Sequence, residues 1–181
     1  LGDGVGLGKT AEISALINFL RVRKLFKKAL VAVETTAFYQ TLAELIKFTG
    51  LYVVVLPSES KDMKKVIKNT DWSKVDVIVI KHSSLRSDTL STWISLNIDK
   101  DGKCSLYDTF ILDESSVIKK VTTKTYRYTE NICNLADRVH FLNATTFETH
   151  IMDIYNQVDM MIPNLLPKRW RIDKEFCKFG W

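Results

Sequence analysis

Residues 1–10, LGDGVGLGKT, hold four of the seven glycines in this 181-residue chain, and a Lys-Thr pair follows the last of them directly. A glycine-rich loop before a helix lets backbone N–H groups approach phosphate oxygens, and the helix N-terminus adds partial positive charge. Lys9 could then neutralise β- and γ-phosphates, and the Thr10 hydroxyl could hold Mg²⁺. The strict pattern G-x-x-x-x-G-K-[ST] fails only at Asp3, which stands in place of its first glycine. The alternative is an ordinary glycine-rich turn before a helix.

Apolar runs alternate with amphipathic segments along the rest of the chain. The runs that predict strands are residues 29–34, 51–56, 75–80, 108–114 and 138–144. The segments that predict helices are one beginning near Lys9 and residues 37–50, 61–69, 123–137 and 148–161. This alternation predicts an α/β fold, with a mostly parallel central sheet and helices on both faces. We expect the basic and aromatic tail, residues 167–181, to pack against the sheet edge rather than to bind nucleic acid.

Composition narrows the class of protein. The net charge of +5 leans weakly toward a polyanionic partner. Three widely spaced cysteines fit neither a disulfide framework nor a zinc site, and His82 and His150 have no metal-ligand spacing to any of them. We therefore expect a reducing, intracellular compartment: a prokaryotic or virus-infected cytoplasm, or a nucleus. No apolar run reaches the roughly 18 residues of a membrane span.

Two acidic residues follow the fourth predicted strand. Asp113 and Glu114 end the stretch TFILDE, residues 109–114. In parallel α/β folds ligands collect at the carboxyl ends of strands. An Asp there can bind Mg²⁺, and the adjacent Glu can polarise an attacking water. Together with the loop around Lys9, this pair predicts nucleotide hydrolysis.

At these motifs the sequence resembles the Swi/Snf-type DNA-translocating ATPases, relatives of the superfamily-two helicases. Their ATP-binding motif reads L-A-D-E-M-G-L-G-K-T and also has Asp where this chain has Asp3. FILDESSVIKK, residues 110–120, resembles their Asp-Glu-Ala-His box followed by I-K-N. FLNATTFETH, residues 141–150, resembles L-T-G-T-P-I-x-N, and residues 29–48 and 75–88 resemble the intervening strand and loop motifs. The resemblance covers almost the whole chain.

The resemblance implies that residues 1–181 form the first RecA-like ATP-binding lobe of a two-lobed motor. The lobe would lack its first strand, and the second lobe would lie outside the chain. The cofactors implied are ATP and Mg²⁺, and the partners are nucleic acid, chiefly double-stranded DNA, and the second lobe. No membrane partner is expected.

Particular residues take roles by the same resemblance. The residues implied for nucleotide binding are Asp3, Gly4, Val5, Gly6, Leu7, Gly8, Lys9 and Thr10. Thr10 and Asp113 would hold the metal, and Glu114 and Lys9 would be catalytic. The residues implied for nucleic-acid contact and coupling are Thr35, Thr36, Lys81, His82, Ser83 and Thr145.

Several positions depart from the family pattern. Ser116 replaces the His of the box, Thr146 replaces a proline, and Thr149 replaces an asparagine. We expect hydrolysis to survive these changes, whereas the coupling of hydrolysis to movement is in doubt. Two alternatives to a translocase stay open: a strand-separating helicase on DNA or RNA, and a nucleotide-dependent nucleic-acid-binding module without turnover. Because the second lobe would supply an arginine finger, the chain alone is expected to be nearly inactive.

Overall fold

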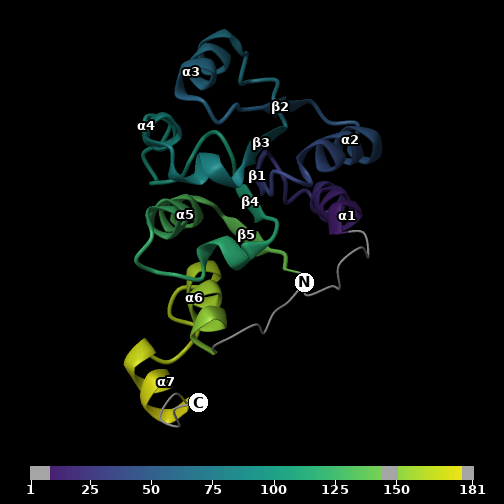
Figure 1. Cartoon of the computed structure of the whole chain (residues 1–181). Helices are drawn as coiled ribbons and strands as arrows, with labels where there is room; N and C mark the ends of the chain where they lie inside the picture. Colours follow the sequence, from purple (N-terminus) through teal and green to yellow (C-terminus); the bar gives the residue numbers. More distant parts are fainter. Residues whose placement is uncertain (1–8, 144–150, 177–181) are drawn as a thin grey trace.

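A five-stranded, fully parallel sheet lies between two layers of helices in the computed structural model, which describes residues 9–143 and 151–176 (Figure 1). The strand order is β2-β3-β1-β4-β5. The strands are β1 (Ala29–Val33), β2 (Val53–Val55), β3 (Val77–Lys81), β4 (Thr109–Leu112) and β5 (Arg138–Phe141). The α-helices are α1 (Lys9–Val22), α2 (Phe38–Thr49), α3 (Ser60–Asn69), α4 (Asp88–Ser95), α5 (Lys124–Leu135), α6 (Ile151–Met161) and α7 (Arg169–Phe176). Two 3₁₀ turns, η1 (His82–Arg86) and η2 (Ser115–Ile118), follow β3 and β4. The predicted α/β fold is confirmed.

The position of β1 at the centre of the sheet explains why its sequence is apolar without interruption. β1 pairs with β3 and with β4, so that Ala29 lies opposite both Val77 and Thr109. Val31 and Val33 face the layer of α1 and α2, whereas Leu30 and Ala32 face α3, α4 and α5 (Figure 1). A strand covered on both faces must be apolar at every position, since neither set of alternate side chains meets water.

The two edge strands differ from the central ones. The continuous apolar run 51–56 predicts a buried strand, yet β2 is only half-buried at each of its three residues. Residues Arg138–His140 of β5 are half-buried too. Each of these strands has a hydrogen-bonded neighbour on one side only in the described sheet, so apolar character alone overstated the burial of 51–56. This detail of the prediction is wrong.

α1 and α2 lie side by side and run in the same direction. Near their C-terminal ends, Asn18 Nδ2 donates to the Phe48 carbonyl at 3.0 Å, and Arg21 Nη1 donates to the Thr49 carbonyl at 3.1 Å. α2 ends as predicted at Gly50, whose φ of 64° is a left-handed conformation that glycine adopts without strain. α2 starts just after the carboxyl end of β1, so its parallel neighbour α1 also starts at the carboxyl edge of the sheet.

The C-terminal helices do not follow the prediction for the tail. α7 contacts α6 and lies at the far end of the molecule from the sheet, as Figure 1 shows. Its Trp170 side chain is 64% exposed. The expectation that the tail packs against the sheet edge is therefore wrong for Arg169–Phe176. No helix in the described parts of the chain is both long and apolar enough to cross a membrane.

Candidate nucleotide site

The carboxyl edge of the sheet gathers most of the predicted site residues. Thr35 and Thr36 follow β1, His82 and Ser83 follow β3, and Asp113 and Glu114 follow β4. Because all strands are parallel, these three segments lie at one edge. α1 begins at the same edge, with its backbone helical from Lys9 onward. The structure thus brings the acidic pair and the start of the first helix to one end of the sheet.

The backbone around the acidic pair is anchored on both sides. The Asp113 N–H donates to the Ala32 carbonyl at 2.9 Å, and the Ser115 N–H donates to the Leu142 carbonyl at 2.9 Å. The Ser115 hydroxyl donates to Gln157 Oε1 at 2.6 Å, which ties this segment to α6. Residues 113–115 are therefore fixed to β1, to the segment after β5 and to α6.

Glu114 has an unusual conformation. Its φ of 52° and ψ of 67° lie in the left-handed region. For a residue with a Cβ this conformation costs on the order of 1 kcal/mol, and it persists only where the surroundings hold it. Such strain is concentrated at functional sites, which supports a functional hypothesis for this turn.

The donor chemistry of the edge fits Mg²⁺. Asp113 is a carboxylate only 5% exposed, at the end of a strand, and Glu114 follows it. No group of three His, Cys, Asp or Glu side chains suited to a metal occurs within residues 9–143 and 151–176. Mg²⁺ bound with a nucleotide is held by one or two carboxylates together with phosphate and water oxygens, and the Asp113 carboxylate could serve as such a ligand.

His82 joins the segment after β3 to the acidic pair. Its Nε2 lies 2.7 Å from the carbonyl oxygen of Asp113. Burial lowers the pKa of His82, while the bond to the Asp113 carbonyl and the charges of Asp113, Glu34 and Glu114 oppose that shift. The ring is therefore neutral near pH 7. Since a carbonyl oxygen only accepts, Nε2 carries the proton.

Lys81 and the hydroxyl residues at this edge are more exposed to solvent than Asp113 is. Thr35, Thr36 and Ser83 are exposed. Lys81 Nζ lies 4.9 Å from the ring centroid of Phe38, a cation–π distance that keeps its charge at the edge. The Ser83 hydroxyl is 2.9 Å from the Ser58 hydroxyl.

Other predicted residues lie outside the described part of the chain. They are Asp3, Gly4, Val5, Gly6, Leu7, Gly8 and Thr145, together with the family departures Thr146 and Thr149. For Lys9 and Thr10 the backbone alone is described.

Comparisons with known proteins agree with this geometry. No protein-family model matches the chain. The chain is 28% identical to the uncharacterized ATP-dependent helicase YqhH of Bacillus subtilis over 180 residues, which are 98% of this chain and 28% of that protein. It is 27% identical to the DNA excision repair protein ERCC-6-like of Bos taurus over 164 residues, 88% of this chain and 12% of that protein.

Solved structures give the fold. The SWI2/SNF2 ATPase core of Sulfolobus solfataricus in complex with dsDNA matches with a TM-score of 0.76 at 20% identity, over 98% of this chain and 34% of that one. The chain has the fold of a SWI2/SNF2-type ATPase lobe. The same core solved as a domain matches with a TM-score of 0.68. The resemblance to Swi/Snf-type ATPases and the RecA-like α/β lobe are thus confirmed, and the chain spans about a third or less of these proteins.

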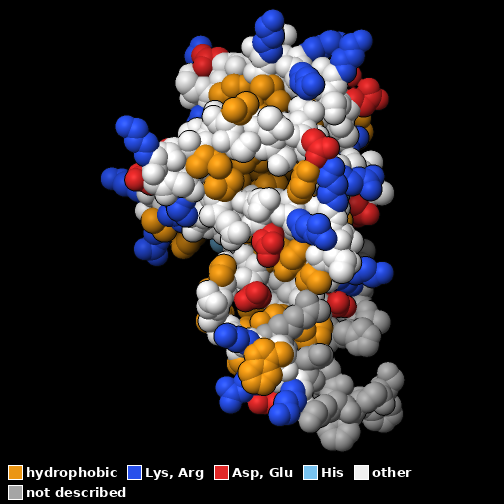
Figure 2. Space-filling view, turned by 90° about the vertical axis from the view of Figure 1, so that its left-hand side faces the viewer, with side chains coloured by type: hydrophobic (Ala, Val, Ile, Leu, Met, Phe, Trp, Pro, Cys, Tyr) orange, Lys and Arg blue, Asp and Glu red, His pale blue; other side chains and the backbone are white. Residues whose placement is uncertain are grey.

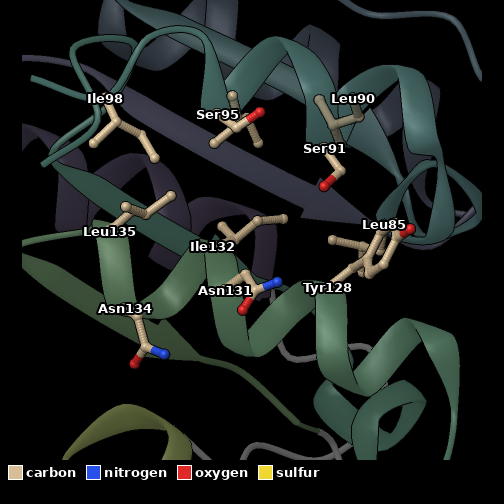
Figure 3. Close-up of a pocket in the computed structure, with 11 residues that line it drawn as sticks. Leu85, Leu90, Ser91, Ser95, Ile98, Tyr128, Asn131, Ile132, Asn134 and Leu135 are labelled. Atoms are coloured by element: carbon tan, nitrogen blue, oxygen red, sulfur yellow. The ribbon is translucent and has the colours of Figure 1, made fainter. Parts of the chain in front are cut away.

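An apolar groove lies apart from the residues gathered at the carboxyl edge. The groove, of about 260 Å³, lies between α4 and α5, and Leu90, Ile132 and Leu135 line it (Figure 3). None of the predicted site residues contributes to it. Cys133, which follows the lining residue Ile132 in the chain, is buried, and this burial raises the pKa of its thiol. The groove is therefore separate from the nucleotide site.

Sequence reasoning missed Gln157, and it named His82 without its bond to Asp113. Gln157 on α6 holds Ser115, and the His82 ring holds the Asp113 carbonyl rather than facing solvent alone. The available signal for Gln157 was an amide among apolar residues of the predicted helix 148–161. For His82, no sequence signal indicated a partner 31 residues away.

Proposed function

We propose that this chain is the ATP-binding and hydrolysing lobe of a Swi/Snf-like, DNA-dependent ATPase. The observation that carries the proposal is the buried Asp113 followed by a left-handed Glu114, at the edge of the sheet where α1 begins. The similarity to an ATP-dependent helicase and to the SWI2/SNF2 ATPase fold supports ATP as the nucleotide. Residues 1–181 would form the first RecA-like lobe, and a second lobe elsewhere in the protein would close over the nucleotide.

In this proposal each residue acts on one part of the nucleotide. The amides of residues 3–8 and the Lys9 ammonium bind the phosphates, and the α1 dipole adds to this electrostatic attraction. The Thr10 hydroxyl and the Asp113 carboxylate hold Mg²⁺, which when bound neutralises charge on the phosphate oxygens. The Glu114 carboxylate accepts a hydrogen bond from the attacking water and orients it toward the γ-phosphorus.

Duplex DNA would lie along the loops that follow β1 and β3. Thr35, Thr36 and Ser83 offer exposed hydroxyls and Lys81 offers a cation, which are the groups that contact backbone phosphates without reading sequence. The solved complex of the Sulfolobus solfataricus core with dsDNA supports this choice of partner. On the face of α4 and α5, by contrast, Lys and Arg lie in separate groups with Asp and Glu between them (Figure 2). That face offers no single basic surface to a duplex.

The test is steady-state phosphate release by the whole protein, with and without duplex DNA, beside a strand-displacement assay. We expect duplex DNA to stimulate hydrolysis without strand separation. Strand displacement would favour a helicase, and no hydrolysis under any condition would favour a binding module without turnover. The chain of residues 1–181 alone should release phosphate at well below about one per second, because one face of the nucleotide stays open to water. Turnover at that rate or faster would contradict the single-lobe proposal.

A further inference from the structure

The His82 hydrogen bond crosses a strand. β3 and β4 are not neighbours, since β1 lies between them in the sheet. The imidazole nevertheless reaches from the end of β3 over the end of β1 to the Asp113 carbonyl, 2.7 Å away. A neutral Nε2–H ring and a protonated ring both have this donor, so the bond does not depend on a particular charge state.

The carbonyl that His82 binds belongs to the peptide unit between Asp113 and Glu114. Rotation of that unit changes the ψ of Asp113 and the φ of Glu114 together. The φ of Glu114 is 52°, in the left-handed region, which a residue with a Cβ adopts only where its surroundings stabilise that conformation. A hydrogen bond to this carbonyl therefore bears directly on the conformation that aims the Glu114 side chain.

The residues beside His82 belong to the surface expected to meet DNA. Lys81 precedes it, and Ser83, which follows, is exposed and tied through its hydroxyl to Ser58. The imidazole itself is half-buried, with Nε2 directed at a carbonyl. Its Nε2–H is thus already engaged within the protein, which disfavours the role of a phosphate contact that the resemblance implies.

We propose that His82 is a positioning residue that links the loop after β3 to the Asp113–Glu114 peptide, so that a movement of this loop on DNA changes the aim of Glu114. The proposal rests on the proposed function and names the route by which DNA would regulate the nucleotide site. In this chain Ser116 stands where the resembled box has its His. The imidazole next to the acidic pair comes instead from the loop after β3.

The first experiment compares variants of the whole protein: His82→Phe, His82→Ala, His82→Gln and Lys81→Ala. Phe keeps the ring without the donor, Ala removes both, and Gln can present an N–H at a similar reach. We expect Phe and Ala to lower kcat at saturating duplex DNA by about tenfold or more, because misplacement of a catalytic group by ~1 Å costs that much. The DNA concentration for half-maximal rate should change by less than about twofold, and Gln should restore most of kcat, as a donor-based role requires.

Lys81→Ala should show the opposite pattern: it should raise the half-saturating DNA concentration and change kcat little. If His82→Phe instead raises that concentration and leaves kcat at saturation intact, His82 is a DNA contact and the proposal is overturned. Failure of Gln to restore kcat would also overturn it, because the donor would then not be what matters.

The second experiment needs no activity. Hydrogen exchange of the backbone amides of residues 114–116 should accelerate by about fivefold in His82→Phe and His82→Ala, as expected for the loss of one hydrogen bond. The amides of β1 should be unaffected, and His82→Gln should restore protection. Unchanged exchange in both variants overturns the positioning role. If exchange changes as expected while the wild type hydrolyses no ATP, it is the proposed function that fails and not the structural link.

Discussion

The two ends of strand β4 each carry a buried aspartate, and the two are held in different ways. Asp108 directly precedes the strand and is 8% exposed, and Asp113 directly follows it and is 5% exposed. The Asp108 carboxylate lies 3.0 Å from the Arg138 guanidinium and accepts the Lys28 N–H at 3.0 Å. At Asp113 the main chain makes the described bonds, from its N–H to Ala32 and from His82 to its carbonyl.

In the proposed function, this difference separates a structural charge at Asp108 from a functional charge at Asp113. The charge of Asp108 is matched within the fold by a cation and by backbone amides that tie β1, β4 and β5 together at their amino ends. Removing it leaves those partners without an acceptor, which is costly. At Asp113 the backbone anchors would survive loss of the carboxylate. In the proposed function the Asp113 carboxylate would hold Mg²⁺ at the edge where α1 begins.

The largest effect expected at the carboxyl edge comes from Lys9→Ala. The phosphates would lose a charged partner, so affinity for ATP–Mg²⁺ should fall by about a hundredfold or more. Calorimetric titration of the whole protein measures this. Arg23→Ala, just beyond the other end of α1, is the matched control and should keep wild-type affinity. Equal affinity in Lys9→Ala and wild type would remove the start of α1 from the site.

The two aspartates can be compared directly by substitution. Asp108→Ala should lower the free energy of unfolding by about 3 kcal/mol, because the Arg138 pair and two amide bonds are lost. Asp113→Ala should lower it by less than Asp108→Ala does, since the main-chain bonds of Asp113 to Ala32 and His82 stay. Urea denaturation of both variants gives the two values. A loss at Asp113 as large as that at Asp108 would show that both ends of β4 serve the fold alone.

A smaller effect is expected at Lys81. Lys81→Ala should weaken duplex DNA binding by a few-fold and reduce the slope of log affinity against log salt by about one, as for a single phosphate contact. Fluorescence anisotropy over a salt series provides both numbers. Lys124→Ala is the control, because Lys124 is exposed and paired with Asp88. Identical salt slopes for Lys81→Ala and wild type would exclude a phosphate contact at Lys81.

The sequence predicted the central strands well for a physical reason. Strands such as β1 are covered on both faces, and that condition leaves a continuous apolar run that no helix face requires. The acidic pair could be placed because it directly follows such a run. The short helix α4 was missed, although Ser87, whose side chain accepts the Leu90 N–H, gave a capping signal. Eight residues are too few for a clear helical period.

The finer geometry of the site could not be predicted. The left-handed φ of Glu114 leaves no trace in the residue type, since glycine is the usual residue there and Glu is not. The bond from His82 to Asp113 depends on strand order, which places β1 between β3 and β4. Neither the order of the strands nor the hydrogen bonds across them can be read from local patterns along the chain.

The proposed function depends most on Glu114, which would orient the water that hydrolyses ATP at the carboxyl end of β4. It is tested most directly by phosphate release from Glu114→Gln in the whole protein with duplex DNA, measured beside calorimetric ATP binding. The amide keeps the shape of the side chain but orients water poorly and accepts no proton, so the rate should fall by about a hundredfold or more while ATP affinity stays within threefold. Hydrolysis within about threefold of wild type would contradict the account.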